Sequence, residues 1–272
     1  MMVSSTPGAP AGIVGVRFLN ARPLLGGLEA GIAAPFPYRF STAEPSVCAD
    51  LVTRGEAVAG LIPVAALPYL PEVGAIPRLG VACREEATSV LLVSKVELAE
   101  VRTLAVHTAS RTSAALARLL LAERWGVTPR IVPAAPPLET MLTGADAAVV
   151  IGDPALALRG RSGLLEVDLA AAWVEWTRLP FVFAVWGVRR EAPAGVEELL
   201  EASLAYSRAH WEELLARWAQ THGVAVERTR EYLERTLTYR LDDEARAGME
   251  EFLRRAAAAG VLPRREGVWR AA

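Results

Sequence analysis

The sequence predicts an α/β protein with a bilobal fold: two doubly wound lobes joined by two crossing strands and followed by a helical C-terminal tail. Short apolar segments rich in β-branched residues alternate with helical segments from about residue 12. The alternation begins again near residue 95, so we expect a second α/β unit inserted into the first. From Pro193 onward the hydrophobic spacing is helical throughout, and no strand is expected there.

The composition is that of a folded globular protein without a strong net charge. The chain has 272 residues, of which 52% are apolar and 22% charged, enough for a large core in more than one lobe. Its 29 basic and 31 acidic residues nearly cancel, which argues against nucleic acid as a partner. No apolar run is long enough to cross a membrane, and the first ten residues lack the features of a secretion signal. We therefore expect a cytoplasmic protein with no membrane partner.

The first unit begins with a strand and a helix that starts at a proline. The apolar run of residues 12–16 predicts a buried strand, and Pro23 suits the first turn of the next helix. Further strands are expected at residues 37–40 and 57–62, with helices at about 23–31 and 42–55 and a short helix from Pro63. This β-α-β-α-β order is typical of a parallel sheet.

The second unit repeats this order before the chain returns to the first. Strands are expected at residues 88–94, 103–107, 130–133 and 146–151, with helices from Ser110, over 138–142 and from Gly152. An aromatic and β-branched segment, residues 179–188, predicts the returning strand. Lobe one should comprise residues 1–93 and 183–272 and lobe two residues 94–182, with a ligand cleft between them.

Polar side chains follow the predicted strands or begin the predicted helices at four places. These are Asn20, Ser46, the segment from Ser110 to Ser113, and Asp153. Hydroxyl groups at a helix start, beside free N–H groups and the positive end of the helix dipole, suit an anion, and the segment that contains Thr112 fits this description. The other three also have a local interpretation, as helix caps or turn residues.

The motifs of several enzyme classes are missing. The sequence has no glycine-rich dinucleotide or phosphate loop, no nucleophilic serine elbow and no His/Cys cluster with metal spacing. Cys48 and Cys83 are therefore expected as buried thiols. His210 and His222 fall on the tail and are expected on the surface, whereas His107 ends a strand and either faces the cleft or has a structural role.

Five segments occur in an order that is specific, although each alone is a weak signal. They are Phe18-Leu-Asn-Ala-Arg-Pro-Leu, Gly60-Leu-Ile-Pro-Val-Ala-Ala-Leu, Ser110-Arg-Thr-Ser, Ile151-Gly-Asp-Pro-Ala-Leu, and the stretch from Asp168 through Trp173 to Trp186. Together they resemble the chorismate dehydratases of the futalosine route to menaquinone. The resemblance extends from about residue 12 to about residue 262.

This resemblance implies a fold and a reaction. The fold is the type II periplasmic-binding-protein fold. The reaction is the dehydration of chorismate to 3-[(1-carboxyvinyl)oxy]benzoate, the first step of that route, with no metal or organic cofactor. His107 departs from the family pattern, in which we expect a smaller or acidic residue at this strand end.

The resemblance also implies site residues. Asn20 matches the family's active-site asparagine and is the candidate catalytic residue. The candidate substrate-binding residues are Ser110, Thr112 and Ser113, which match the family's Ser-Arg-Thr-Ser segment, Ser46 and Ser89, which lie in segments similar to cleft-lining ones, and Asp153.

The predicted chemistry needs a base, and Asp153 is the motif carboxylate nearest the expected cleft. The enolpyruvyl arm of chorismate carries its own carboxylate close to the C3 proton, so the base is either this group or Asp153. Asn20 would hydrogen-bond the departing hydroxyl or the ring carboxylate as charge develops.

Two other functions fit the same fold. One is a non-catalytic protein that binds a small anion, and the other is the sister enzyme 1,4-dihydroxy-6-naphthoate synthase. The absence of an export signal argues against a transport receptor, and the first strand near residue 12 leaves no room for a preceding DNA-binding module. The five segments are more similar to those of the dehydratase.

Overall fold

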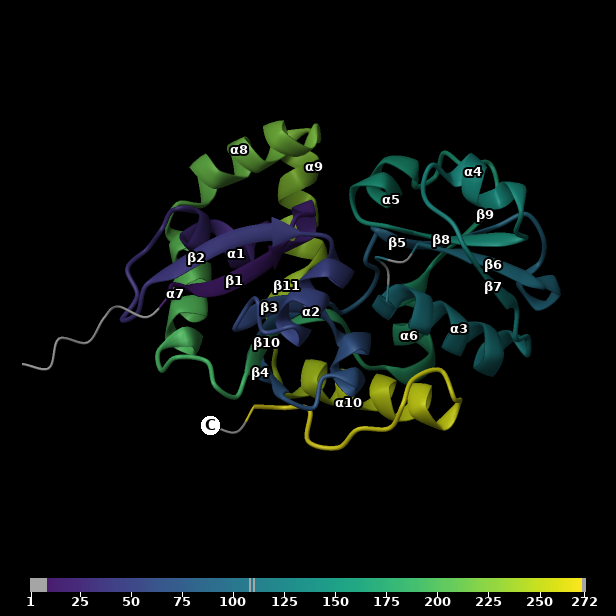
Figure 1. The fold of residues 1–272 in the computed structure, drawn as a ribbon. Coiled ribbons are helices and arrows are strands. Elements are labelled where there is room, and N and C mark those ends of the chain that lie inside the picture. The colour runs from purple at the N-terminus through teal and green to yellow at the C-terminus, as the bar shows by residue number, and fades with distance from the viewer. Residues whose placement is uncertain (1–8, 108, 110, 271–272) are drawn as a thin grey trace, which may run out of the picture.

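The computed structural model describes residues 9–107, 109 and 111–270 (Figure 1). The strands are β1 (Ala11–Val16), β2 (Tyr38–Ala43), β3 (Ala59–Pro63), β4 (Val73–Cys83), β5 (Val90–Ser94), β6 (Thr103–Val106), β7 (Arg130–Pro133), β8 (Ala147–Ile151), β9 (Leu165–Asp168), β10 (Phe181–Arg189) and β11 (Thr238–Arg240). The α-helices are α1 (Arg22–Glu29), α2 (Pro45–Thr53), α3 (Arg111–Trp125), α4 (Leu138–Thr143), α5 (Asp153–Leu158), α6 (Leu169–Thr177), α7 (Val196–Ala209), α8 (Trp211–His222), α9 (Val226–Arg230) and α10 (Asp243–Ala258). Shorter helical turns are η1 (Leu19–Ala21), η2 (Val64–Tyr69), η3 (Leu98–Glu100) and the π-helical η4 (Glu231–Thr236).

The strands form two mixed sheets. The six-stranded sheet has the order β11-β4-β10-β3-β1-β2, and the five-stranded sheet has the order β7-β6-β8-β5-β9. Parallel pairs join β1 to β2 and β3, and β6 to β7 and β8. The strands β5 and β10 run antiparallel to their neighbours. Each of them follows a segment in which the chain passes from one sheet to the other. The predicted α/β architecture with a helical C-terminal region is confirmed.

One large hydrophobic core extends through both sheets. It includes Ile13 of β1 and Leu92 of β5, whereas Leu91 and Val93 belong to a smaller core on the opposite face of the five-stranded sheet. Because successive residues of a strand point to opposite faces, β5 contributes to both cores. Its unbroken apolar sequence follows from this position.

The sequence does not predict β4, an 11-residue strand. Its segment contains Pro77 and two glycines, which interrupt the alternation that identifies a strand. Pro77 lies between Ala75 and Gly80, where the register against β10 shifts. Gly80 is needed there, because a Cβ atom would lie 2.6 Å from the carbonyl oxygen of Ala184. The irregular register therefore accommodates both residue types inside the sheet.

The expectation of an all-helical chain after Pro193 is wrong at β11. This strand has only three residues and pairs antiparallel with β4. A strand of this length has no alternation to detect in the sequence. The third helix of the tail agrees with expectation: Asp242 caps α10 by accepting a hydrogen bond from the N–H of Ala245 at 2.9 Å.

The chain passes between the sheets at two short segments, residues 84–89 and 178–180. Each contains a non-glycine residue in the left-handed region, Thr88 with φ 59° and Arg178 with φ 62°. Such conformations persist only where the surroundings hold them. The lobe boundaries, placed after residues 93 and 182, stay a prediction.

The carboxylate of Asp168 holds the first crossing segment and the start of the helix that leads into the second. It accepts hydrogen bonds from the backbone N–H groups of Ala87 and Thr88 in the first segment, at 3.1 and 2.7 Å. It also caps α6, the helix that leads into the second segment, by accepting from the N–H groups of Ala170 and Ala171 at 3.0 Å. Burial raises the pKa of Asp168, while these donors act in the opposite direction.

Aromatic side chains pack the second crossing segment against α10. The indole N–H of Trp173 donates to the carbonyl oxygen of Pro180 at 3.3 Å, and its ring meets those of Phe181 and Phe252 edge-on. α10 approaches so closely that a Cβ atom on Gly248 would lie 2.1 Å from the Pro180 oxygen. α10 contacts both β10 and α3, and in Figure 1 it runs beneath both sheets.

A close contact with α7 fixes α1. A Cβ atom on Gly27 would lie 2.6 Å from the Cα atom of Ser203, so only glycine permits this approach. The Ser203 hydroxyl donates to the carbonyl oxygen of Leu24 at 2.8 Å and accepts from the N–H of Leu28 at 3.1 Å. The first residue of α1, Arg22, thereby takes a defined position next to η1.

Replacing Asp168 by alanine should lower the free energy of unfolding by about 3 kcal/mol or more, because several backbone N–H groups lose a charged acceptor in the interior. Urea denaturation measures the difference. Glu85→Ala removes an exposed carboxylate from the same crossing segment and should change the value by less than about 0.5 kcal/mol. Equal midpoints for the two variants would contradict the role assigned to Asp168.

Candidate active site

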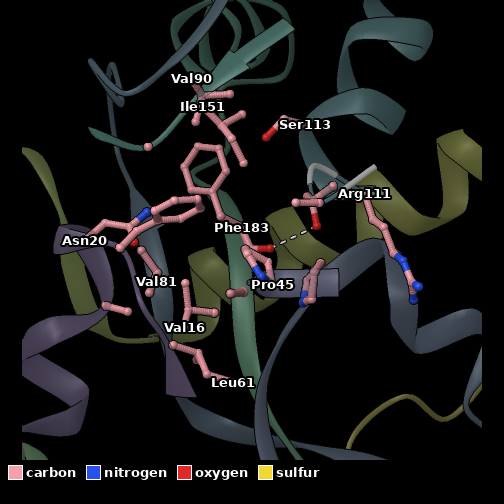
Figure 2. A pocket seen from close by; sticks show the side chains of 17 residues that line it. Val16, Asn20, Pro45, Leu61, Val81, Val90, Arg111, Ser113, Ile151 and Phe183 are labelled. Atoms are coloured by element: carbon pink, nitrogen blue, oxygen red, sulfur yellow. Dashed lines mark hydrogen bonds between the residues drawn. The ribbon is translucent and has the colours of Figure 1, made fainter. Parts of the chain in front are cut away.

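A cavity lies between the two sheets, at the carboxyl ends of β1, β3 and β8 and beside the start of α3 (Figure 2). It contains about 530 Å³ of space free of protein atoms, part of it open to solvent. Its lining is mostly apolar, with Phe18, Phe183 and Ile151 among the larger side chains. Ligands of open α/β sheets bind at such strand ends.

Asn20 reaches the cavity from η1, the turn that follows β1. On either side of it Leu19 and Ala21 are fully buried, so the backbone of this turn is fixed. Pro23 in the first turn of α1 sets the direction in which the chain continues. Asn20 makes no hydrogen bond to the other described residues that line the cavity (Figure 2).

Thr112 and Ser113 both lie in the cavity wall at the start of α3, but their hydroxyls differ. The Thr112 hydroxyl donates to the carbonyl oxygen of Phe183 at 3.0 Å and accepts from the N–H of Ala65 at 3.2 Å. It therefore joins α3 to β10 and η2. The Ser113 hydroxyl points into the cavity in Figure 2 and is the better placed to contact a ligand. Ser110 lies outside the described residues.

Ser46 and Ser89 are not among the described residues that line the cavity. Ser46 lies in the first turn of α2, next to Pro45, which does line it. Ser89 is 1% exposed, and its hydroxyl oxygen accepts a hydrogen bond from Tyr232 at 2.5 Å. Burial raises the pKa of Tyr232, so the phenol keeps its proton and donates. Ser89 thus links the first crossing segment to the tail.

Asp153 begins α5 beside the cavity, but it does not line it. One carboxylate oxygen accepts from the backbone N–H of Leu19 at 3.2 Å, and the other lies 2.6 Å from Nδ1 of His222. The side chain of His222 is 7% exposed, so the expectation of a surface histidine is wrong. No local pattern signals this contact, because the two partners are 69 residues apart. His210 is exposed, as expected.

The lining carries little charge. Arg111 is the one charged residue among the described lining residues; it pairs with Asp50 at 2.8 Å, and its guanidinium points away from the cavity (Figure 2). Arg17 is exposed and pairs with Glu44. The Nδ1 of His107 accepts from the N–H of a neighbouring residue, Ala109, at 3.3 Å. Within the described part of the chain, no carboxylate or imidazole lines the cavity.

The two cysteines are buried free thiols, as expected. Burial raises the pKa of Cys48 to about 12, so its thiol is uncharged at neutral pH. The described residues contain no group of three His, Cys, Asp or Glu side chains arranged as a metal site.

Comparison with known proteins identifies the family. Residues 13–258 match the profile of a protein family described as Menaquinone biosynthesis. The chain belongs to this family. A curated relative, the chorismate dehydratase of Thermus thermophilus, is 34% identical over 237 residues, which cover 79% of this chain and 85% of the relative. The family resemblance inferred from the five segments is confirmed.

Solved structures share the fold of this menaquinone biosynthesis family member. A protein from Archaeoglobus fulgidus aligns with a TM-score of 0.75 at 16% identity, covering 92% of this chain and 98% of that one. The alkanesulfonate-binding protein of Xanthomonas axonopodis pv. citri, bound to MOPS, aligns with a TM-score of 0.65 at 16% identity, covering 98% and 100%. These likenesses confirm the periplasmic-binding-protein-like fold.

Among the helices of the described residues, none has the length and apolar character to cross a bilayer.

Several residues of this family member's site are absent from the predicted set. Phe18 and Phe183 form apolar walls of the cavity, and both lie in segments that carry the family resemblance. The sequence could therefore have predicted both phenylalanines as cavity residues. Tyr232 and His222 belong to the tail, whose helical pattern gives no signal for either contact.

Thr112→Val should lower the free energy of unfolding by about 2 kcal/mol, because it leaves the Ala65 N–H and the Phe183 carbonyl without a partner in the interior. Thr112→Ser keeps the hydroxyl and should recover most of this loss. Ser113→Ala, the matched change at the next position, should cost less than about 1 kcal/mol. Denaturant midpoints give the order, and a Thr112→Val protein as stable as wild type would show that this hydroxyl is not a structural link.

Proposed function

We propose that this protein dehydrates chorismate to 3-[(1-carboxyvinyl)oxy]benzoate, the first step of the futalosine route to menaquinone. The observation that carries the proposal is the position of Asn20. This asparagine of the Leu-Asn-Ala segment lies in the wall of the cavity between the sheets, in a chain 34% identical to a chorismate dehydratase. Membership of the menaquinone biosynthesis family supports the same role.

The reaction makes a benzene ring from a ring diene. Chorismate carries a ring carboxylate, a hydroxyl on C4 and an enolpyruvyl ether on C3. The C3 proton passes to a base, and the C4 hydroxyl leaves with a proton from that protonated base, so that one molecule of water is lost and the base is restored. Conjugation with the ring carboxylate acidifies the proton, and the aromatic product makes the reaction favourable. The enzyme must direct this path and suppress rearrangements of the ether arm.

The cavity suits a flat, partly apolar ring with polar groups at its ends. Phe18, Phe183 and Ile151 supply apolar walls, which exclude water and strengthen each remaining polar interaction. Asn20 approaches from the six-stranded sheet and Ser113 from the five-stranded sheet. The two therefore hold different parts of the substrate, and closing the sheets sets the distance between them.

The base is the carboxylate of the substrate's own enolpyruvyl arm. Among the described residues no carboxylate or imidazole lines the cavity, and both oxygens of Asp153 are occupied by Leu19 and His222. The arm carboxylate is one ether linkage from C3. The protein has only to hold the arm so that an oxygen meets the C3 proton, and such proximity can contribute about 7–11 kcal/mol in favourable cases.

Asn20 stabilises the charge that develops as the proton and hydroxyl leave. Its side-chain NH₂ group donates to the departing hydroxyl or to the ring carboxylate, and it moves no proton itself. An amide that is already oriented by a fixed backbone gains most from this role, because it needs no rearrangement during the reaction.

Asn20→Ala should lower turnover of chorismate by about 10²- to 10³-fold while the fold survives, because one donor to the developing charge is lost. Asn20→Asp should also fail, because an anion that only accepts replaces a donor. Product is followed by absorbance of the new aromatic ring and by mass. Near-normal turnover of Asn20→Ala would refute the role of this residue.

A chorismate analogue whose enolpyruvyl carboxylate is converted to a methyl ester should bind but form no aromatic product, because the internal base is missing. Wild-type enzyme and free chorismate are the reference, and mass spectrometry of the ring product is the measurement. Dehydration of the ester at a rate within about tenfold of chorismate would assign the base to a side chain instead.

The same assays separate the alternative functions. Tight binding of chorismate without any product would identify a binding protein. Inactivity toward chorismate, together with formation of a dihydroxynaphthoate when the sister enzyme's own substrate is supplied, would identify the sister enzyme.

A further inference from the structure

We propose that Asp153 and His222 are positioning residues that hold the Asn20 turn in its reactive conformation when the two sheets close on substrate. This inference rests on the proposed function, since it assigns Asn20 a role in turnover. Leu19, which precedes Asn20, and Arg22, two residues after it, bind this one histidine–aspartate pair. Asn20 itself lies between these two anchors.

The first anchor is the backbone N–H of Leu19. The turn η1 begins after Phe18, whose side chain gives it no cap, so this N–H needs a partner from elsewhere. Asp153 supplies it at 3.2 Å from a position 134 residues away in the sequence. Because Asp153 begins α5, which follows β8 of the other sheet, the turn that carries Asn20 is complete only when α5 lies against it.

The second anchor is the guanidinium of Arg22. Its Nε–H donates to Nε2 of His222 at 3.0 Å, while its other nitrogens bind the carbonyl oxygen of Arg17 and the carboxylate of Glu29. An arginine donor on Nε2 leaves the imidazole proton on Nδ1, as assigned from these contacts. That nitrogen faces Asp153 at 2.6 Å, so the histidine donates to the carboxylate.

The surroundings make these contacts specific. The side chains of His222 and Arg22 are 7% and 14% exposed, so water competes little with their hydrogen bonds. Gly152 precedes Asp153 with φ 66°, and a Cβ atom there would lie 3.1 Å from the ring of Phe18. Glycine thus lets the start of α5 reach η1. A second contact, from Arg228 of α9 to the carbonyl oxygen of Leu156, joins the tail to α5 nearby.

These contacts couple closure to chemistry. Opening the sheets would separate Asp153 from Leu19 and from His222 at once, so the turn would lose its cap whenever the cavity is open. Asp153 takes no part in proton transfer and acts through the Leu19 N–H. Asn20 is therefore held for reaction only inside the closed cavity, where water is excluded.

Steady-state kinetics of histidine variants test the positioning role. His222→Phe keeps the ring shape but loses both nitrogens, and kcat should fall about 10- to 100-fold with KM changed less than about threefold, because orientation rather than binding is lost. His222→Gln retains a donor and an acceptor and should keep kcat within about threefold of wild type. His210→Phe, the same change at the exposed tail histidine, should leave both constants unchanged. Wild-type kinetics in His222→Phe would overturn the proposal.

A double-mutant cycle tests whether the pair acts through Asn20. In an Asn20→Ala background, His222→Phe should lower kcat no further, because the group that it positions is gone. Additive losses would overturn the proposal. If His222→Phe does not fold, Asp153→Asn replaces it in the same cycle, since its amide places a donor opposite the Nδ1–H of His222.

Solution scattering gives a readout that does not depend on turnover. Saturating chorismate should compact wild type and Asn20→Ala to the same radius of gyration, whereas His222→Phe should stay more open. Compaction of His222→Phe equal to wild type would overturn the coupling to closure. If wild type formed no product from chorismate, the proposed function would fail instead, so the two failures are distinct.

Discussion

The carboxylate of Asp168 connects the first segment in which the chain passes between the sheets to the start of α6, the helix that leads into the second. Its oxygens bind the first crossing segment and cap the helix that leads into the second. The strands that begin beyond these segments, β5 and β10, bring Val90 and Phe183 into the cavity wall. Thr88 is held in its left-handed conformation by the bond from its own N–H to the Asp168 carboxylate, whereas Arg178 ends α6, where its N–H donates to the carbonyl oxygen of Val174.

A second carboxylate, Asp153, acts between the sheets in a different way. Asp168 binds main-chain N–H groups of the first crossing segment and of the start of α6, so its bonds can persist while the sheets move. Asp153 begins a helix of one sheet and binds Leu19 and His222 on elements of the other, so its bonds exist only when the two are together. In the proposed closure, the first carboxylate therefore holds a crossing segment in both states, and the second marks the closed end of the movement.

The sequence predicts those parts of the fold that local patterns encode. The parallel strands and their helices appear close to their predicted positions because each carries an apolar run or a proline at a helix start, as Pro23 does. β4 is missed because Pro77 and Gly80 are tolerated only through a register shift against β10, which is a property of the partner strand. The same distinction applies to the site. Asn20 and Ser113 are predicted because they lie in segments that resemble the family, whereas the burial of His222 depends on a distant aspartate that no sequence spacing reveals.

The groups that would ordinarily suggest acid–base chemistry are withdrawn from the cavity. Asp153 and His222 lie close to it, but they are hydrogen-bonded to each other. The Nδ1 of His107 accepts a hydrogen bond from the N–H of Ala109, two residues further along. The described lining leaves the amide of Asn20, the hydroxyl of Ser113 and apolar walls, because the Thr112 hydroxyl binds Ala65 and Phe183. A site of this kind cannot move protons rapidly, but it can fix the conformation of a flexible anion and exclude water from it. For a substrate that carries its own carboxylate next to an acidic C–H bond, holding that conformation is the larger part of the task. In the proposed reaction, the positions of Asn20 and its anchors therefore matter more than any side-chain pKa.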